Sequence, residues 1–342
     1  MSLIYLLSLI FLNLVDGKIC KLFNFMKILI TGILGQDGQI LTELLKKNHQ
    51  IFGVTHLETS ENRIKNFEIK HNIKIYKKDL IHIKNCMDLI EDVQPDVIVN
   101  FAGVTNVFNP WDNQLELVNQ NLIIPVNILN TIKEINQNIF FFQASSSLMF
   151  GNSGTNEICE KTNLSPIYPY GIAKAFVHNL IDEYRINLNL QCSSGIFFNH
   201  DSFFRKNKFL TKKLASFVAN IEKTDPKKIS LGNLDGFIDI SHAYDFMSGV
   251  KLIIENKMNE NYVFSSGKLV KVYDLVKLFF EFKNLDIENY VEYDKTLDRK
   301  NQTQIYGNNN KLRSLGWEPK FDLKLLVKDL IEMEVRYENI IC

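Results

Sequence analysis

Apolar runs alternate with amphipathic stretches over the first two hundred residues of the chain. Nearly all-apolar runs predict strands at 27–32, 51–56, 73–80, 96–103, 139–146 and 192–200, and helical spacing of apolar residues predicts helices at 39–50, 85–93, 117–135 and 171–188. Strands that are apolar throughout are typical of parallel sheets buried on both faces. The pattern therefore predicts an α/β fold of the Rossmann type, with a doubly wound parallel sheet.

The pattern becomes less regular and more basic after about residue 200. We therefore expect a dinucleotide-binding Rossmann domain at 26–199 and a smaller, mainly substrate-binding C-terminal lobe at 200–342, with late sheet elements around 237–265. Residues 1–25 form an apolar N-terminal extension that is too short to span a bilayer comfortably. Since Met26 directly precedes the first strand, this extension is either dispensable or not native, and a membrane-associating segment is the alternative.

Composition removes several classes of function. The 39 basic and 39 acidic side chains balance, so the overall charge favours neither nucleic acid nor an anionic membrane as a partner. The five cysteines are scattered without a Cys-x-x-Cys pair, which fits a reducing, cytoplasmic location. The seven histidines have no spacing typical of zinc sites, so we expect no bound metal.

A glycine-rich turn follows the first predicted strand and opens the first helix. Gly32, Gly35 and Gly38 stand at G-x-x-G-x-x-G spacing within "TGILGQDG". Gly32 permits a tight turn, Gly35 lets a pyrophosphate approach the backbone, and Gly38 lets the helix pack close to the sheet. The phosphates of a dinucleotide would then lie at the helix N-terminus, whose free N–H groups attract anions.

Other strand ends complete the predicted cofactor site without fixing the cofactor. Asp79 and Leu80 suit an adenine contact after the third strand, and Phe101-Ala102-Gly103 would run beside the cofactor after the fourth. An acidic residue at the end of the second strand would bind the ribose of NAD, and an arginine would bind the 2′-phosphate of NADP. Neither stands there, but Glu58 and Arg63 follow closely and each could serve.

A candidate proton-transfer group lies further along the chain. Tyr170 and Lys174 are one helical turn apart on one face, and a serine cluster, Ser145 to Ser147, precedes them at a strand end. A lysine ammonium lowers the pKa of a neighbouring phenol, whose phenolate can then take a proton from a sugar hydroxyl. The lysine could also hold the nicotinamide ribose. A Tyr-x-x-x-Lys spacing alone is often an ordinary surface pair, but its order after the glycine turn and the serine cluster is typical of extended short-chain dehydrogenases.

Several segments resemble the GDP-mannose 4,6-dehydratase family in the same order. They are "TGILGQDG" (31–38), "FFNHDS" (197–202), "FLTKK" (209–213), "LGNLDGFIDISHAYDF" (231–246) and "LGWEPK" (315–320). The resemblance covers roughly residues 26–335. It implies a homo-oligomeric enzyme that acts on GDP-mannose with NADP: C4 is oxidised, water is eliminated across C5–C6, and hydride returns to C6.

The resemblance also implies roles for individual residues. Ser146, Tyr170 and Lys174 would act in catalysis, and Thr105, Ser145 and Ser146 would contact the sugar. Around the cofactor would lie Gln36, Asp37, His200 and Arg205, the last two near its nicotinamide end. Asn199 would contact the pyrophosphate, Lys213 the nucleotide and Arg299 a phosphate. Taken alone, Lys213 and Arg299 would be interpreted as solvated surface charges.

Three positions depart from the family pattern. Leu148 stands where the family has the glutamate expected to act as base at C5 and acid at the C6 hydroxyl. Ile238 replaces an arginine expected on the diphosphate. The loop after the second strand is shorter than in the family and lacks two arginines, so NAD remains an option as cofactor. Proton transfer by a placed side chain contributes roughly 10²–10⁴-fold, so losing the glutamate should nearly stop elimination unless another group, such as Asp201, substitutes.

These observations leave three hypotheses. The first is a nucleotide-sugar enzyme of this family that acts on GDP-mannose or a related GDP-sugar in polysaccharide synthesis, with dehydration in doubt. The second is a non-dehydrating 4-dehydrogenase, reductase or epimerase. The third is a cofactor-binding pseudoenzyme subunit, against which the intact Tyr170 and Lys174 argue.

Overall fold

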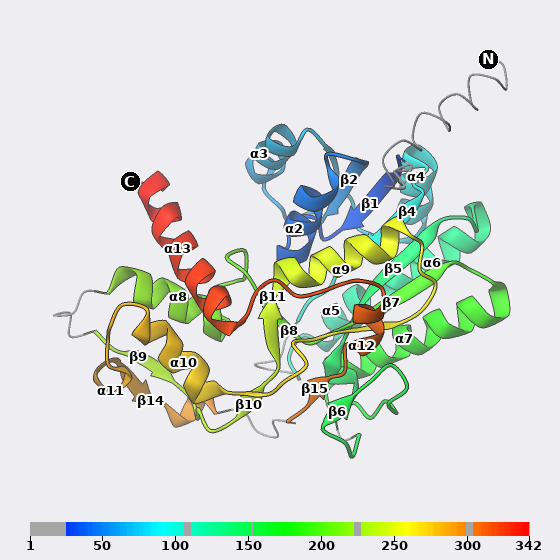
Figure 1. Cartoon of the computed structure of the whole chain (residues 1–342). Helices are drawn as coiled ribbons and strands as arrows, with labels where there is room; N and C mark the ends of the chain where they lie inside the picture. Colours follow the sequence, from blue (N-terminus) through cyan, green and yellow to red (C-terminus); the bar gives the residue numbers. More distant parts are fainter. Residues whose placement is uncertain (1–24, 106–110, 152, 222–226, 299–303, 342) are drawn as a thin grey trace, which may run out of the picture.

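The computed structural model describes residues 25–105, 111–151, 153–221, 227–298 and 304–341 (Figure 1). The apolar extension up to residue 24 and the predicted phosphate ligand Arg299 therefore lie outside the described residues. Among the described helices, none is both long and apolar enough to cross a membrane.

A seven-stranded parallel sheet forms the centre of the molecule, in the order β12-β7-β5-β4-β1-β2-β3. Its strands are β1 (Lys27–Thr31), β2 (Gln50–Thr55), β3 (Lys74–Lys77), β4 (Val97–Asn100), β5 (Phe140–Ser146), β7 (Cys192–Phe197) and β12 (Tyr262–Phe264). The strand order reverses between β1 and β4, which are direct neighbours. This is the doubly wound Rossmann topology, and it confirms the predicted fold class.

Helices cover both faces of this sheet. The helices of this part of the chain are α2 (Gln36–Leu45), α3 (Glu61–His71), α4 (Ile83–Val93), α5 (Gln114–Val118), α6 (Ile124–Ile135), α7 (Pro169–Leu188) and α9 (Ala243–Glu255). Helix α2 packs against α9, and α4 packs against α6. Alternate residues of each strand enter opposite cores: Phe140 and Phe142 face the core with α9, while Phe141 faces the core with α4 and α6.

A separate hydrophobic cluster lies beside the sheet in the C-terminal part (Figure 1). Its elements include α8 (Leu210–Asn220), β9 (Ile229–Leu231), β11 (Ile240–His242), α10 (Val272–Glu281), α11 (Ile287–Tyr290), β14 (Val291–Tyr293) and α13 (Leu323–Ile341). The remaining elements are η1 (Asn119–Ile123), η2 (Ser147–Met149), β6 (Glu157–Ile158), β8 (Asn199–Asp201), β10 (Phe237–Ile238), β13 (Val270–Lys271), η3 (Lys295–Leu297), β15 (Tyr306–Gly307) and α12 (Asn310–Ser314). Of the late elements, β12 joins the main sheet, while β11 pairs with β8.

Several element bounds differ from the sequence-based expectation. The helix expected at 39–50 begins at Gln36, directly after Gly35 of the glycine turn, and ends at Leu45. Helix α3 was not predicted, since only three of its residues are buried. The strand expected at 192–200 ends at Phe197, and β8 then joins a different sheet. The long helix expected at 117–135 contains the π-helical turn η1, which starts at Asn119.

Candidate functional site

The glycine turn has the shape that a dinucleotide site requires. Gly32 has a φ of 65°, in the left-handed region that favours glycine. A Cβ at Gly38 would lie 2.5 Å from Ile33 Cα, so only glycine lets α2 approach β1 this closely. A Cβ at Gly35 would meet only the Gly32 carbonyl, at 3.1 Å, so the opposite side of the turn is open to a ligand. Helix α2 begins here without a side-chain cap on its first N–H groups, which fits a bound pyrophosphate.

The segment after β4 packs directly against this turn. A Cβ at Gly32 would lie 3.0 Å from both the Ala102 nitrogen and the Phe101 carbonyl. Ala102 N–H donates to the Thr31 hydroxyl at 3.1 Å, which ties the two strand ends together. The predicted contact residues Phe101 and Ala102 are thus placed along the turn, at the carboxyl edge of the sheet where Rossmann folds bind cofactors.

Gln36 and Asp37 join the turn to the chain after β7. Asp37 accepts a hydrogen bond from His200 Nε2 at 3.1 Å, and Gln36 donates to the His200 carbonyl at 3.1 Å and accepts from Ser202 at 3.0 Å. Burial alone would raise the pKa of Asp37, but the His200 charge lowers it overall. Burial alone would lower the pKa of His200, but Asp37 raises it. The two side chains form a buried ion pair between distant parts of the sequence.

Tyr170 lies at the N-terminus of α7, where Pro169 occupies the first turn. Burial raises the pKa of Tyr170, and hydrogen bonds with the side chains of Thr105 and Ser146 act in the opposite direction. The sequence-based expectation that Lys174 lowers this pKa is wrong for the net shift, because burial is the largest cause. The hydroxyl is nevertheless held between the two side chains that the sequence placed at the sugar.

Lys174 is buried one turn further along α7, with its Nζ 5.7 Å from the centroid of the Tyr170 ring. Its ammonium donates to the Ala144 carbonyl at 2.9 Å, and burial lowers its pKa to about 8. A Cβ at Gly103 would lie 3.9 Å from Lys174 Nζ and 2.5 Å from Asn121 Oδ1. Gly103 thus borders the Tyr–Lys pair, next to Asn121.

Asn121 is a site residue that the sequence analysis missed. It is buried on the π-helical turn, its amide donates to the Val104 carbonyl at 2.9 Å, and its Oδ1 has no hydrogen-bond partner. A buried unpaired acceptor is unusual and points to a ligand or water at this place. No sequence signal distinguishes it, because Asn119, Asn127 and Asn130 lie in the same predicted helix.

Leu148, which the resemblance places where the family has a glutamate, lies next to Ser146 and the start of α7. Its N–H donates to the Ser146 hydroxyl at 3.2 Å, and its carbonyl oxygen would lie 2.4 Å from a Cβ at Gly171, the neighbour of Tyr170. The backbone therefore keeps Leu148 beside the Ser146–Tyr170 pair. Its side chain offers no proton to a substrate.

The carboxylates that could replace this glutamate have other partners. Glu160 accepts from the Val263 N–H at 2.9 Å, which agrees with a structural role. Asp201 forms an ion pair with Arg205 at 2.8 Å and accepts from Thr211 at 2.6 Å. The Arg205 charge also acts on Tyr170, Asp37 and His200, so Arg205 faces the site where the sequence analysis placed it.

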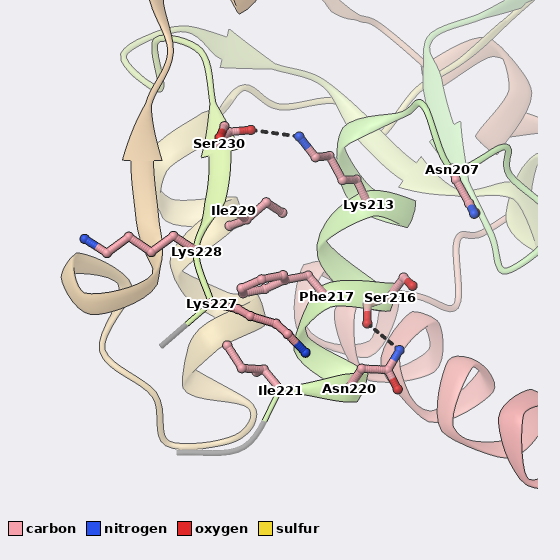
Figure 2. Close-up of a pocket in the computed structure, with 10 residues that line it drawn as sticks. All are labelled: Asn207, Lys213, Ser216, Phe217, Asn220, Ile221, Lys227, Lys228, Ile229 and Ser230. Carbon is pink, nitrogen blue, oxygen red and sulfur yellow. Dashed lines mark hydrogen bonds between the residues drawn. The ribbon is translucent and has the colours of Figure 1, made fainter. Parts of the chain in front are cut away.

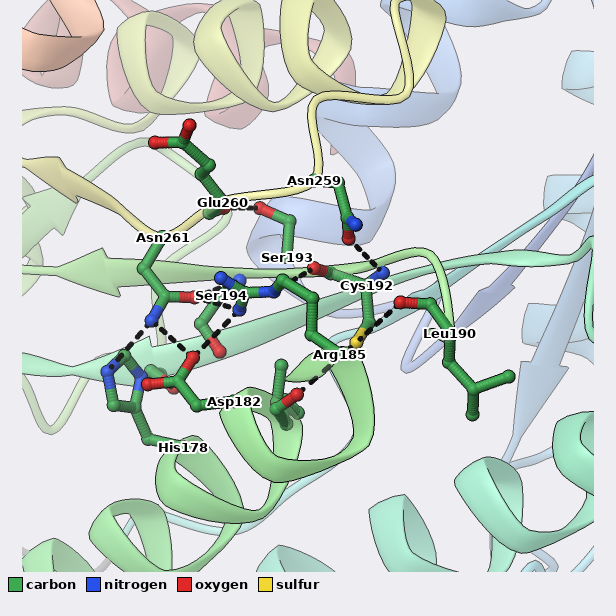
Figure 3. A network of polar contacts seen from close by, with 12 residues as sticks. His178, Asp182, Arg185, Leu190, Cys192, Ser193, Ser194, Asn259, Glu260 and Asn261 are labelled. Carbon is green, nitrogen blue, oxygen red and sulfur yellow. Dashed lines mark hydrogen bonds and ion pairs between the residues drawn. The ribbon is translucent and has the colours of Figure 1, made fainter. Parts of the chain in front are cut away.

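Ser145 contacts His178. His178 belongs to a polar network along α7 that Figure 3 shows. His178 Nδ1 lies 3.4 Å from the Ser145 hydroxyl, and His178 Nε2 lies 3.3 Å from the Asn261 amide nitrogen. Asn261 Oδ1 accepts from Arg185 at 2.7 Å, so its amide group donates toward His178, whose Nε2 must be the acceptor. His178 is then a neutral imidazole that donates to Ser145, and burial lowers its pKa. The His178 network thus holds the Ser145 hydroxyl in place on the side away from Tyr170.

Three predicted ligands lie apart from the Tyr170 group. Asn199 donates to the Asp239 carbonyl at 3.0 Å, and Asp79 caps the chain after β3 by accepting from the Ile81 N–H at 3.0 Å. Lys213 donates to the Ser230 carbonyl at 2.8 Å and lines a cavity of about 540 Å³ between α8 and β9, together with Lys227 and Lys228 (Figure 2). The lining of the cavity is basic and includes the aromatic ring of Phe217.

The predicted contact Leu80 and the residue after Ile238 both have structural partners. Leu80 is buried, and its carbonyl oxygen accepts from Asn127 at 3.1 Å, so only its backbone neighbourhood could border an adenine. Beside Ile238, the buried Asp239 accepts from Ser266 at 2.8 Å and from the Gly307 N–H at 3.0 Å. Burial raises the pKa of Asp239, and the hydrogen bonds that its carboxylate accepts offset part of this rise.

Comparison with known proteins agrees with the resemblance inferred from the sequence. The family model for GDP-mannose 4,6 dehydratase matches residues 29–330. The chain is 30% identical to GDP-mannose 4,6 dehydratase of Homo sapiens over 94% of each chain. It is 26% identical to a GDP-mannose 4,6-dehydratase of Sordaria araneosa, with 90% of this chain matched, and it spans 60% of that relative's length.

The fold is also that of a solved enzyme structure. The structure of dTDP-glucose 4,6-dehydratase from Bacillus anthracis in complex with NAD has a TM-score of 0.80 and 19% identity, over 92% of this chain and 98% of that one. The chain is thus matched along nearly its whole described length by fold and by sequence. It belongs to the GDP-mannose 4,6-dehydratase family.

Proposed function

We propose that this protein is an NAD(P)-dependent enzyme that oxidises C4 of a nucleotide sugar, GDP-mannose or a related GDP-sugar, for polysaccharide synthesis. The observation that carries the proposal is the Tyr170 hydroxyl held between Thr105 and Ser146, beside the buried Lys174 and at the same sheet edge as the glycine turn. The related enzymes named above act on GDP-mannose and dTDP-glucose, which supports a nucleotide sugar as substrate.

The residues around Tyr170 can move one proton. When bound, the dinucleotide supplies a nicotinamide that accepts hydride from the sugar carbon. Ser146 and Thr105 would hold the C4 hydroxyl against Tyr170, whose phenolate takes the hydroxyl proton. Because burial raises the pKa of Tyr170, the phenolate needs the positive charges of Lys174 and the bound nicotinamide to form near neutral pH.

Dehydration is the step that this site does not support. Leu148 stands beside Ser146 and Gly171, and the neighbouring acid Asp201 is already bound by Arg205 and Thr211. We therefore propose that the reaction stops after oxidation at C4, which run in reverse is the reduction of a 4-keto sugar, or that the hydride returns to the opposite face of C4, as in an epimerase. The nucleotide would lie toward Asn199 and the cavity of Lys213, with Arg299 outside the described residues.

An exposed apolar surface supports a homo-oligomer. Helix α5 packs beside α7, and both leave large apolar side chains in solvent: Leu115 is 75% exposed, Ile172 54% and Phe176 50%. Ile172 and Phe176 are one turn apart and therefore share a face of α7. We propose that this α5–α7 surface packs against the same surface of a second copy.

Mass spectrometry of GDP-mannose incubated with the purified protein and either NAD or NADP tests the reaction. A product lighter by two hydrogens, with reduced cofactor, is the expected result. A product lighter by one water would overturn the proposal that Leu148 prevents elimination. The variant Tyr170→Phe should abolish turnover while cofactor binding remains.

Other outcomes separate the remaining hypotheses. No reaction with GDP-, UDP-, dTDP- or CDP-sugars, together with intact dinucleotide binding, would identify a cofactor-binding pseudoenzyme. A product of unchanged mass is checked by NMR for inversion at C4, which would identify an epimerase. Either result would contradict a 4-dehydrogenase.

A further inference from the structure

The side chain of Leu148 does not belong to the core of the protein. Leu148 is half-buried, and it contributes to none of the three hydrophobic clusters of the described residues. The two residues that follow it, Met149 and Phe150, are fully buried in the core with α9. An isobutyl group that packs in none of these clusters is available to a ligand, since ligand sites are lined mostly by apolar side chains.

Two contacts fix the backbone of Leu148 close to the Tyr170 hydroxyl. Its N–H donates to the Ser146 hydroxyl at 3.2 Å, and Ser146 in turn forms a hydrogen bond with Tyr170. Its carbonyl oxygen would lie 2.4 Å from a Cβ at Gly171, so only glycine lets the start of α7 approach this closely. A sugar whose C4 hydroxyl lies at Ser146 and Tyr170 would therefore have Leu148 beside it.

The chemistry of a hexose decides which of its groups can lie against this leucine. On either side of C4 a hexose carries a polar group, a hydroxyl at C3 and a hydroxymethyl at C5. A hydroxyl that is buried against an isobutyl group loses its hydrogen bonds with water and gains none. In a 6-deoxy sugar the group at C5 is a methyl, whose burial against the leucine is favourable. A C6 methyl is thus the group next to C4 that matches Leu148.

The acids considered as replacements for the family's glutamate do not offset this mismatch with a C6 hydroxyl. Asp201 pairs with Arg205 at 2.8 Å and accepts from the Thr211 hydroxyl at 2.6 Å. Glu160 accepts from a backbone N–H of β12 at 2.9 Å. Both carboxylates therefore have partners that compete with a sugar hydroxyl.

We propose that Leu148 selects a 6-deoxy sugar, so that this chain oxidises or reduces C4 of a nucleotide-linked 6-deoxyhexose in preference to mannose. In the reducing direction, C4 of the 4-keto sugar receives hydride from the reduced dinucleotide, and its oxygen receives the proton of Tyr170. The ketone becomes an alcohol, the dinucleotide is oxidised, and no water is lost.

This selection gives the reaction a place in a sequence of reactions. A ketone at C4 together with a methyl at C5 is the product of 4,6-dehydration of a hexose. The chain would therefore act on the product of such a dehydration, carried out by another enzyme. The inference rests on the proposed function and names the sugar on which the same site acts.

Substrates that differ only at C6 test this proposal. Cofactor reduction by the unmodified protein is measured with GDP-mannose and with GDP-6-deoxymannose, using NAD and NADP in turn. The reverse reaction is followed with GDP-4-keto-6-deoxymannose and the reduced cofactors, and NMR identifies the C4 epimer formed. We expect reduction of the keto sugar, and a kcat/KM for GDP-6-deoxymannose about tenfold to a hundredfold above that for GDP-mannose.

Two results would contradict these expectations in different ways. Equal values for the two sugars, or a preference for GDP-mannose, would overturn the selection of a 6-deoxy sugar but leave oxidation at C4 in place. Turnover of none of the three substrates would overturn the proposed function itself, and this inference with it.

Variants at Leu148 show whether this side chain makes the selection. Leu148→Asn places an amide of similar size beside C6 and should reduce the preference for the 6-deoxy sugar to about threefold or less. Leu148→Ala removes the apolar contact and should lower kcat/KM for the 6-deoxy sugar alone. Leu188→Asn makes the same change at the far end of α7, where the leucine is 40% exposed, and should leave both values unchanged. An unchanged preference in both Leu148 variants would overturn the role of this residue.

Discussion

Under the proposed function, Leu148 is the residue that most changes the chemistry expected of the family. Its backbone contacts with Ser146 and Gly171 keep it beside Tyr170, so a longer acidic side chain would begin from the same place. We expect Leu148→Glu to introduce dehydration, with a gain of roughly 10²-fold or more in the product lighter by one water. The measurement is the rate of formation of that product by mass spectrometry.

The control variant Leu148→Gln shows whether any gain in dehydration by Leu148→Glu comes from its acid. Leu148→Gln has the shape and hydrogen bonds of glutamate but transfers no proton at neutral pH. It should leave dehydration at the level of the unmodified protein. Equal dehydration by the Gln and Glu variants would show that polarity or space at this position matters, and not an acid.

The buried charge of Lys174 should lower the free energy of unfolding of this protein. Burial lowers its pKa from 10.5 to about 8, so the folded protein holds this proton less tightly than the unfolded chain. Between these two pH values the unfolded chain binds more protons, and the free energy of unfolding rises with pH. We expect Lys174→Met to stabilise the protein by roughly 2–3 kcal/mol at pH 7, after the lost hydrogen bond to Ala144 is allowed for.

Urea unfolding at pH 7 and at pH 10.5 measures this effect. The gain from Lys174→Met should shrink at the higher pH, where the native lysine is largely neutral in the fold. Lys133→Met, which alters an exposed lysine of α6, serves as the control and should show no such pH dependence. A gain that is equal at both pH values would mean that packing, and not charge, limits stability here.

Residues with a distinctive spacing could be predicted from the sequence, and residues without one could not. Gly32, Tyr170 and Lys174 were visible because a turn and a helical face require them at fixed intervals. Asn121 was not visible, because its importance comes from a buried unpaired oxygen that only the folded structure reveals. The direction of the pKa shift of Tyr170 was also missed, since burial of a phenol cannot be read from its neighbours in sequence.

At the scale of elements, α7 carries the site on one stripe of its surface. Tyr170, Lys174, His178 and Asp182 follow one another at intervals of four residues, and they face the end of β5 and the Asn261 side chain. The first pair lies at the candidate site. Of the second pair, His178 contacts Ser145. Asp182 accepts from the Asn261 amide, which also contacts His178 (Figure 3). Helical periodicity thus joins the proposed catalytic residues Tyr170 and Lys174 to the residues that support them, although the sequence analysis recognised only the first pair.

Elements were predictable where they are fully buried and less so where they are not. The strands of the central sheet were located within a few residues because both of their faces are apolar. Helix α3 was not predicted, because only Ile64, Phe67 and His71 are buried and they give a weak apolar pattern. The break between β7 and β8 was not predicted, because only Phe198 separates the two strands and no Gly or Pro marks the change of sheet.

At the scale of the whole molecule, long-range contacts bring the site together. The hydrogen bond from Gln36 to the His200 carbonyl joins residues 164 positions apart. Arg205 lies in the loop after His200, and its charge acts on Tyr170. Such pairings could be expected only through the family resemblance, because no local pattern links a glycine turn to a loop after the sixth strand. The boundary between the Rossmann domain and the C-terminal lobe, placed at residue 199, stays a prediction.

The α5–α7 surface allows a test of assembly that is independent of the chemistry. Ile172→Glu combined with Phe176→Glu places two charges on the exposed face of α7, where burial against a second copy would leave them unpaired. We expect the unmodified protein to be a dimer and the double variant a monomer by light scattering after gel filtration. Ile69→Glu, on α3 and 81% exposed, is the control and should remain a dimer. If the double variant stays dimeric, or the unmodified protein is a monomer, this surface does not mediate self-association, and its apolar side chains need another explanation.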